Sequence, residues 1–313
     1  MRPLLCALFL IAAWTSRAED KPKGVTGLDE FEFVYRVKLP EIKGDAHLWI
    51  PLARTDAFQT VTQEEVSIPI KWEKIEDRDY RNLIYALHPQ AEDSGKIIEL
   101  GYRVVRKEKS AYPAQGEDTA RFLQPEKLVP SNETFKTLAT QATAGKKDDL
   151  ERGKALYDHV LGRMRYDKSG TGWGKGDAVY ACDAKTGNCS DFHAYFIALA
   201  RSIDIPARFA IGATIPTDKN EGVIEGYHCW AEFFANGRWV PVDISEAWKN
   251  PQLAGYYFGH NPANRLELTR GRDLIVDPAP ATGPINFLVY PLLEMDGKVV
   301  KPETTFTFRR TRT

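Results

Sequence analysis

Apolar side chains occupy every second position from Phe31 to Leu39, near the start of the chain. This alternation is typical of a β-strand with one buried face. Similar short runs follow over residues 46–52, 65–70, 82–87 and 97–105. Because no helical pattern separates these runs, they predict an antiparallel β-sandwich over residues 28–106. The next stretch is rich in charge, Gly and Pro, and we interpret residues 107–119 as a linker.

The hydrophobic pattern changes to helical spacing after residue 120. Ser131 can cap a helix that ends at Gly145, and Asp148 or Asp149 can begin a second one. A third apolar stripe runs from Phe192 to Ile203, directly after Cys189. Strand patterns return over residues 207–215, 228–234 and 238–243. Helices followed by an antiparallel sheet predict a second, α+β domain over residues 120–313, with a C-terminal strand extension.

The composition is that of an ordinary globular protein. The 313 residues carry a formal net charge of −1, and 27% are charged and 43% hydrophobic. These values exclude collagen-like, coiled-coil and disordered chains, and the length suits two domains of roughly 150 residues each. The near-neutral balance gives no electrostatic reason to expect nucleic acid or an anionic membrane as a partner.

The first 18 residues have the pattern of a signal peptide. Arg2 precedes an apolar stretch from Leu4 to Trp14, and Ser16-Arg17-Ala18 places small residues where a signal peptidase cuts. We expect cleavage before Glu19. The apolar stretch is shorter than the roughly 20 residues that a membrane helix needs. The mature protein is therefore predicted to be exported, most simply to a bacterial periplasm, without an integral membrane segment.

A cysteine stands at the predicted start of the third helix. In Gly187-Asn188-Cys189-Ser190-Asp191, Gly187 permits a tight turn and Asn188 is a competent N-cap. A cysteine in the first helical turn has a lowered pKa, because the helix dipole and free N–H groups favour the thiolate. The alternative is a small buried side chain with no chemistry, which is common for free cysteine. The presence of a base near Cys189 would favour the reactive thiolate over the unreactive buried side chain.

A predicted β-hairpin supplies the candidate base, His228. Asn236-Gly237 between two apolar runs is a strong hairpin signal. With a two-residue turn, Phe234 faces Trp239 and Glu232 faces Pro241, and this register makes His228 and Asp243 diagonal neighbours. Diagonal positions lie about 7–8 Å apart, within reach of an imidazole–carboxylate hydrogen bond.

These residues form a predicted nucleophilic triad. Cys189 is the nucleophile, His228 takes its proton, and Asp243 fixes the tautomer of the imidazole and supports its positive charge. Such chemistry calls for no cofactor and no metal ion. His260 could compete as the base, but no hairpin carboxylate accompanies it.

Four segments together resemble the transglutaminase-like superfamily, a branch of the papain-like cysteine-protease fold. They are residues 187–193 (GNCSDFH), 205–209 (IPARF), 226–232 (GYHCWAE) and 239–243 (WVPVD). The resemblance covers a domain core of about residues 150–248, and the segments 257–260 (YFGH) and 271–273 (GRD) are similar to exported bacterial members. It implies the same three roles for Cys189, His228 and Asp243.

The resemblance leaves the reaction open among peptidases, amidases, transglutaminases and inactive members. The shared chemistry is attack on an amide carbonyl through a thioester, which water or an amine then resolves. We expect a peptide or protein substrate, with hydrolysis slightly favoured because no acceptor-amine site is visible. The alternative is a non-catalytic envelope binding or assembly module that retains the fold, with the β-sandwich as its working part.

Several residues near the triad have open roles. Gln124, Trp173 and Tyr180 are candidate oxyanion donors, although aromatic residues usually serve packing. His193 lies one helical turn after Cys189 and could be a metal ligand or a second proton carrier, but a structural hydrogen-bonding role is the simpler interpretation. Residues 216–226 are charged and Gly-rich and could form a rim over the cleft, or simply a solvated loop.

The remaining cysteines allow three interpretations. Cys182 and Cys229 could form a disulfide in an exported protein, and two buried free thiols are an equal alternative. A zinc site built from Cys182, Cys189, His228 and Cys229 is a third. We do not favour zinc, because the spacings match no standard finger or ribbon.

Overall fold

The computed structural model describes residues 27–311. The predicted signal peptide, residues 1–18, and its cleavage site lie outside this range. Within residues 27–311, no helix is both long and apolar enough to cross a bilayer.

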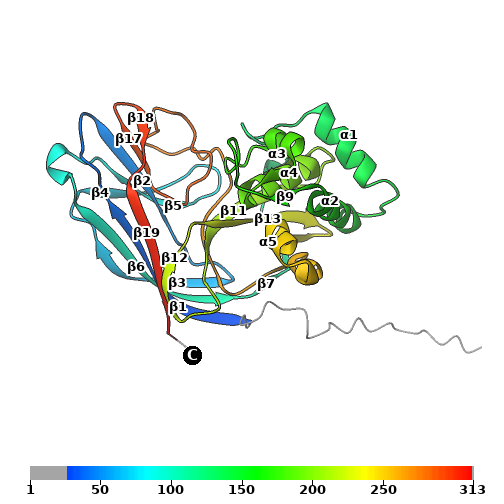
Figure 1. The fold of residues 1–313 in the computed structure, drawn as a ribbon, viewed down its shortest axis with the longest axis horizontal. Coiled ribbons are helices and arrows are strands. Elements are labelled where there is room, and N and C mark those ends of the chain that lie inside the picture. The colour runs from blue at the N-terminus through cyan, green and yellow to red at the C-terminus, as the bar shows by residue number, and fades with distance from the viewer. Residues whose placement is uncertain (1–26, 312–313) are drawn as a thin grey trace, which may run out of the picture.

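Two five-stranded antiparallel sheets pack against each other on one side of the molecule (Figure 1). The first has the strand order β12-β19-β1-β6-β3 and the second β18-β17-β2-β5-β4. The strands of the first are β1 (Leu28–Lys38), β3 (Gln59–Ser67), β6 (Ile97–Lys107), β12 (Glu221–Ile224) and β19 (Glu303–Arg310). Those of the second are β2 (Ala46–Leu52), β4 (Trp72–Glu76), β5 (Leu83–Leu87), β17 (Leu292–Met295) and β18 (Lys298–Val300).

The alternation in β1 produces the interface between these sheets. Phe31, Phe33 and Tyr35 are fully buried, and they belong to one hydrophobic cluster with Leu48 and Ile50 of β2. The residues that alternate with them on β1, such as Glu32, Val34 and Arg36, remain at least partly exposed. Burial of one face of each sheet is what the period-two pattern predicts.

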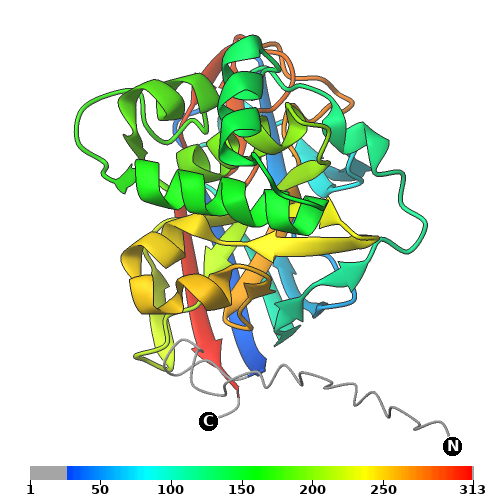
Figure 2. The same ribbon diagram turned by 90° about the vertical axis from the view of Figure 1, so that its right-hand side faces the viewer.

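A third five-stranded sheet lies under a layer of helices on the other side (Figures 1 and 2). Its order is β16-β11-β13-β14-β8, formed by β8 (Tyr112–Pro113), β11 (Ala207–Thr214), β13 (His228–Ala235), β14 (Arg238–Val242) and β16 (Arg265–Arg270). The helices are α1 (Glu133–Ala142), α2 (Asp149–Arg163), α3 (Ala178–Ala184), α4 (Cys189–Arg201), α5 (Ile244–Lys249) and α6 (Ala254–Tyr257). Short two-stranded ladders join β9 (Arg165–Tyr166) to β10 (Thr186–Gly187) and β7 (Lys109–Ser110) to β15 (His260–Asn261). The α+β class predicted from the sequence is confirmed.

Helix α4 is the central helix of this layer. All of its 13 residues are buried, and it contacts β13 and β11 of the sheet as well as helices α1, α2, α3 and α5. Its start is fixed by a capping box, in which Asn188 accepts from the Ser190 N–H while the Asp191 carboxylate accepts from the Asn188 N–H. The predicted N-cap at Asn188 is therefore confirmed.

Some predicted boundaries are wrong. The strand expected over residues 65–70 does not exist as a unit, because β3 ends at Ser67 and β4 begins at Trp72. Pro69 lies between them and has no N–H to donate to a ladder. Helix α1 is capped by Asn132 instead of Ser131. Residues 216–226 are not simply a loop, since β12 lies inside them and pairs with β19.

Residues 107–119, predicted as a linker, contribute β8 to the third sheet and β7 to a separate two-stranded ladder. Within residues 107–119, β7 pairs with β15 and β8 pairs with β14. The Lys109 side chain is fully buried, and its Nζ donates to Glu232 at 2.9 Å and to Glu267 at 3.2 Å. Charge in this stretch therefore reflects buried ion pairs and not a solvated connection.

The C-terminal strand extension returns to the sandwich. Strand β19 pairs with β1 from Phe31↔Arg310 to Lys38↔Glu303, and β17 pairs with β2. The helical layer and the third sheet thus lie, in sequence, between strands of the sandwich.

Replacing Gly212 by Ala is expected to destabilise the third sheet by about 3 kcal/mol or more. Gly212 lies at an irregularity in the β11–β16 ladder, and an added Cβ would overlap the Leu266 carbonyl oxygen. Gly162→Ala in α2 is the matched control, because no atom lies within 4 Å of its added Cβ. It should stabilise the protein by about 0.5–1 kcal/mol through helix propensity. Urea unfolding measures both, and an unchanged midpoint for Gly212→Ala would contradict the packing argument.

Candidate active site

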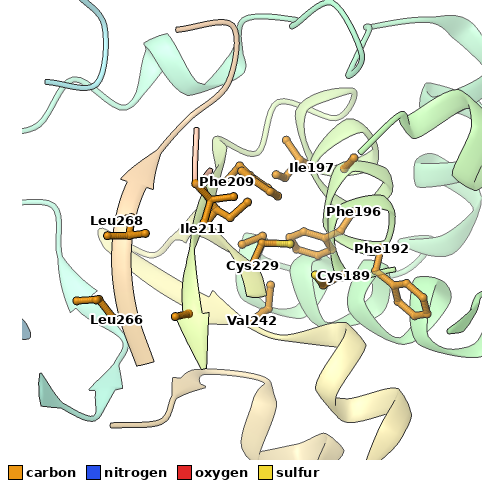
Figure 3. Close-up of a cluster of buried hydrophobic side chains, with 14 of the residues drawn as sticks. Cys189, Phe192, Phe196, Ile197, Phe209, Ile211, Cys229, Val242, Leu266 and Leu268 are labelled. Atoms are coloured by element: carbon orange, nitrogen blue, oxygen red, sulfur yellow. The ribbon is translucent and has the colours of Figure 1, made fainter. Parts of the chain in front are cut away.

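Cys189 is the first residue of α4 and is 2% exposed. Its side chain faces the third sheet in Figure 3, where the thiol of Cys229 on β13 points toward it. The thiol therefore lies where α4 meets the sheet, at the positive end of the helix dipole.

His228 and Asp243 meet at one end of the β13–β14 hairpin. The predicted register is confirmed, with Phe234 opposite Trp239 and Glu232 opposite Pro241. Strand β14 ends at Val242, and Asp243 instead caps α5 by accepting from the Glu246 N–H at 3.1 Å. Its other carboxylate oxygen, Oδ2, lies 2.6 Å from His228 Nε2. The hairpin and the cap thus orient Asp243 from two sides.

The charges at this pair stabilise the protonated imidazole. Burial alone would lower the pKa of His228, but the charge and hydrogen bond of Asp243 outweigh it and raise the pKa to about 9. Burial alone would raise the pKa of Asp243, yet His228, His193 and Arg265 hold it well below its usual range. Arg265 Nη2 lies 3.6 Å from Asp243 Oδ2. At neutral pH the pair is therefore an imidazolium–carboxylate pair.

The thiol of Cys189 is held in its ionised form by its neighbours. Burial acts to raise the pKa of Cys189, but hydrogen bonds from Cys229 and His228, together with the charge of His228, bring it well below the ordinary thiol value. The pKa of Cys229 shifts the opposite way, because burial and the nearby Cys189 disfavour a second thiolate. Cys229 therefore remains a protonated S–H donor beside Cys189. With His228 Nε2 bound to Asp243, Nδ1 is the nitrogen free to exchange a proton with the thiol.

His193 connects the nucleophile to the aspartate. Its Nε2 accepts from the Ile244 N–H at 3.1 Å, so its Nδ1 carries the proton and donates to the Cys189 carbonyl at 2.7 Å. Burial keeps the pKa of His193 below its usual value, which favours this neutral tautomer. The structural hydrogen-bonding role expected for His193 is confirmed, and it fixes α4 to the residue that follows Asp243.

Asp191 anchors a glycine-rich loop to the start of α4. Its buried carboxylate accepts from the N–H groups of Gly174, Gly176 and Asn188, at 2.7–3.0 Å. Tyr227, the residue before His228, adds a second connection. Its hydroxyl lies 2.7 Å from Ser190 Oγ and accepts from the Asn188 amide at 2.9 Å. Gly174 and Gly176 are thereby held at the start of α4.

The structure separates the three oxyanion candidates. The Gln124 carbonyl accepts from Arg201 at 2.8 Å, at the far end of α4, about 18 Å along the helix from Cys189. This distance excludes Gln124 as an oxyanion donor. The order of residues in the sequence does not show at which end of α4 Gln124 lies. Trp173 is half-buried in the anchored loop, and the ring of Tyr180 packs on Gly172 next to it. Trp173 and Tyr180 stay candidates.

The structure does not contain the disulfide between Cys182 and Cys229 that the sequence left open. In the described part of the chain, Cys182, Cys189 and Cys229 are free and buried. Cys182 on α3 interacts with Tyr195, whereas Cys229 Sγ lies 3.7 Å from His193 Nδ1. This arrangement corresponds to the alternative of two buried free thiols. The four residues of the zinc alternative likewise do not appear among the ligand clusters of residues 27–311.

His260 lies apart from the nucleophile. It belongs to β15, its Nδ1 contacts the Tyr256 carbonyl at 3.2 Å, and its ring stacks on the Tyr256 ring. This setting gives it a structural role, and His228 is the histidine beside Cys189.

Comparison with known proteins finds a family model that matches the segment containing this site. Residues 136–244 match the family model of the Transglutaminase-like superfamily, and this segment contains Cys189, His228 and Asp243. The resemblance seen in the sequence motifs is therefore confirmed, and these residues form a transglutaminase-like domain.

Similarity to other proteins extends beyond that segment. The chain is 23% identical over 322 residues to an uncharacterized protein of Haemophilus influenzae, covering 86% of each. It is 27% identical over 171 residues to the uncharacterized protein YebA of Bacillus subtilis, covering 50% of this chain and 22% of YebA. A solved structure called a "putative cysteine protease" from Cytophaga hutchinsonii has 15% identity and a TM-score of 0.64 and covers 92% of both chains. The fold is thus shared along nearly the whole chain.

Proposed function

We propose that the protein is a thiol enzyme that attacks an amide carbonyl of a peptide or protein with Cys189. One observation carries this proposal: a thiol at a helix start interacts with an imidazole whose far nitrogen lies 2.6 Å from a buried carboxylate. A lowered thiol pKa beside a raised imidazole pKa is the arrangement that activates a cysteine nucleophile.

In the proposed reaction the Cys189 thiolate adds to the carbonyl carbon and forms a tetrahedral oxyanion. Backbone N–H groups in the first turn of α4 favour that negative charge, with Trp173 or Tyr180 as further candidate donors. The His228 imidazolium then gives its proton to the leaving amine as the C–N bond breaks, which leaves a thioester on Cys189. Asp243 keeps the imidazole oriented and supports its charge in both steps.

Water resolves the thioester in the reaction that we favour. Neutral His228 takes a proton from the attacking water, the C–S bond breaks, and the carboxylic acid product leaves while the thiolate is restored. An amine in place of water gives a transglutaminase-type product with the same proton transfers. We further propose that the protein acts after export, in a bacterial periplasm.

Site-resolved alkylation across pH tests the proposal. Iodoacetamide labelling followed by mass spectrometry should show Cys189 reacting fastest, at a pH well below the usual thiol pKa of about 8.5. His228→Ala should slow labelling of Cys189 by about tenfold or more at pH 6, because the ion pair is lost. His260→Ala is the matched control and should leave the rate unchanged.

The buried thiols provide an internal check. Cys182 is buried on α3 and interacts with the Tyr195 side chain, so we expect it to react slowly in the native protein. If Cys189 is as inert as Cys182 in a protein that remains folded by circular dichroism, the enzyme proposal fails. That outcome would favour the alternative of a binding or assembly module.

A further inference from the structure

Two histidines and an aspartate form a cluster on the sandwich, on β2 and β5 and the turn before β2. His47 lies on β2 and His88 directly follows β5, and the pairing Leu48↔Leu87 puts these two histidines opposite each other. Asp45 precedes His47 by two residues and therefore lies on the same face of the strand. The pairing of β2 with β5 thus brings three metal-ligating side chains together, away from Cys189, His228 and Asp243.

The side chains converge on one carboxylate. His88 Nε2 lies 2.8 Å from Asp45 Oδ1, and His47 Nε2 lies 3.4 Å from Asp45 Oδ2. One ligand atom from each residue falls within 4.8 Å of the other two. The two imidazole rings are parallel, with centroids 4.6 Å apart, so each must turn about its Cβ–Cγ bond to face a common ion. The two side chains are 36% and 55% exposed, and the His88 ring faces solvent more than the His47 ring, which also stacks on Trp49 with centroids 6.0 Å apart.

The surrounding backbone is fixed. The Asp45 N–H donates to the Asp296 carboxylate at 3.0 Å, and the Asp296 N–H donates to the Asp45 carbonyl at 2.8 Å. Asp296 lies in the turn between β17 and β18, so this pair connects the start of β2 to a neighbouring hairpin. Glu294 is opposite His47 on β17 but is committed elsewhere, since its carboxylate accepts from the N–H groups of Ala281 and Thr282.

We propose that Asp45, His47 and His88 bind a divalent transition-metal ion of the Zn²⁺ type. Two imidazole nitrogens and one carboxylate oxygen are a ligand set that zinc prefers, and a water molecule completes four coordination. Because the ligands come from two adjacent strands and a hairpin-anchored turn, the ion connects the start of β2 to the end of β5, two inner strands of the second sheet. Its role is to stabilise the sandwich, and the proposal is independent of the chemistry of Cys189.

Metal titration of the mature protein tests this site. Calorimetric titration with Zn²⁺ should give one saturable event, and His88→Gln and Asp45→Asn should each weaken it by more than about tenfold, since even outer-shell partners of a metal contribute that much. His260→Gln is the matched control and should bind as the unaltered protein does. Both altered side chains are exposed, so folding should be retained, and circular dichroism checks this.

The cysteine thiols are competing ligands for the metal ion. Titration with Co²⁺ distinguishes binding by a thiol from binding by the two imidazoles and the carboxylate. Co²⁺ bound by nitrogen and oxygen alone lacks the near-ultraviolet charge-transfer band of a thiolate ligand. A titration without this band, whose saturation is lost in His88→Gln, supports the site on the sandwich. A thiolate band that persists in His88→Gln, equal Zn²⁺ affinity of all variants, or no saturable binding overturns the proposal.

Discussion

Replacing Asp243 by Asn should move the pH midpoint for alkylation of Cys189 upward by at least about one unit. The carboxylate is what raises the pKa of His228 to about 9 against the effect of burial. Without that charge, burial prevails and the pKa of His228 falls, so the thiolate loses the cation beside it. The pKa of Cys189 then rises, and less thiolate exists at pH 6.

Turnover should fall much further than alkylation. Loss of the carboxylate from an analogous triad lowers turnover by about 10⁴-fold, because the imidazole adopts the wrong tautomer. The amide oxygen introduced by Asp243→Asn can still accept from the Glu246 N–H, so the cap of α5 is retained. Asp158→Asn is the control, since Asp158 is exposed and pairs with Lys154 on α2. A folded Asp243→Asn protein with an unshifted alkylation midpoint would contradict the proposed role of Asp243.

Replacing Lys109 by Met should lower the free energy of unfolding by about 3–5 kcal/mol. The Lys109 side chain has no exposed surface, and its ammonium group lies between the carboxylates of Glu232 and Glu267. Arg208 also pairs with Glu232, at 2.8 Å, and Arg270 pairs with Glu267. The ammonium group of Lys109 contacts both carboxylates, so its removal leaves each with one cationic partner fewer in a buried setting.

The pH dependence separates a charge effect from a packing effect. Burial alone would raise the pKa of Glu267, but the charges of Arg270 and Lys109 lower it to about 2. A carboxyl group with a lowered folded-state pKa stabilises the fold above its unfolded pKa of about 4.3, and that contribution is lost as the pH falls toward 2. The deficit of Lys109→Met should therefore be largest above about pH 5 and shrink in acid.

Urea unfolding of Lys109→Met and Lys154→Met at pH 7 and pH 4 measures this effect. Lys154 is exposed and pairs with Asp158 one turn along α2, so its replacement should change stability by no more than about 0.5 kcal/mol. Equal losses for the two variants, or a deficit for Lys109→Met that does not depend on pH, would show that the buried ion pairs do not act as described.

Local patterns correctly predicted the start of α4 and the register of the β13–β14 hairpin. Asn188 and Asp191 specify the start of α4 within four residues, and the Asn236-Gly237 turn fixes the pairing of β13 with β14. Each depends on hydrogen bonds between residues close in sequence, so spacing alone contains the information. The meeting of His228 with Asp243 follows from that register.

Long-range packing determined what the sequence could not show. The approach of Cys229 to Cys189 depends on how α4 lies on β13, and no short motif encodes it. The contacts of His193 depend in the same way on the distance between α4 and α5. The local pattern around Lys109 predicts a linker, because its partner carboxylates lie more than 120 residues away and no short motif shows them.

The pairing of β1 with β19 has a consequence for how the chain is assembled. Synthesis proceeds from the N-terminus, so β1 emerges more than 260 residues before its partner Glu303–Arg310. Until then one edge of β1 exposes its N–H and C=O groups, which is the state of a strand most open to pairing with another chain. Strand β19 also pairs with β12, so the first sheet is completed only when β19 is present. We therefore expect that, until β19 is available, the unpaired edge of β1 is the part of the sandwich most prone to pairing with another chain.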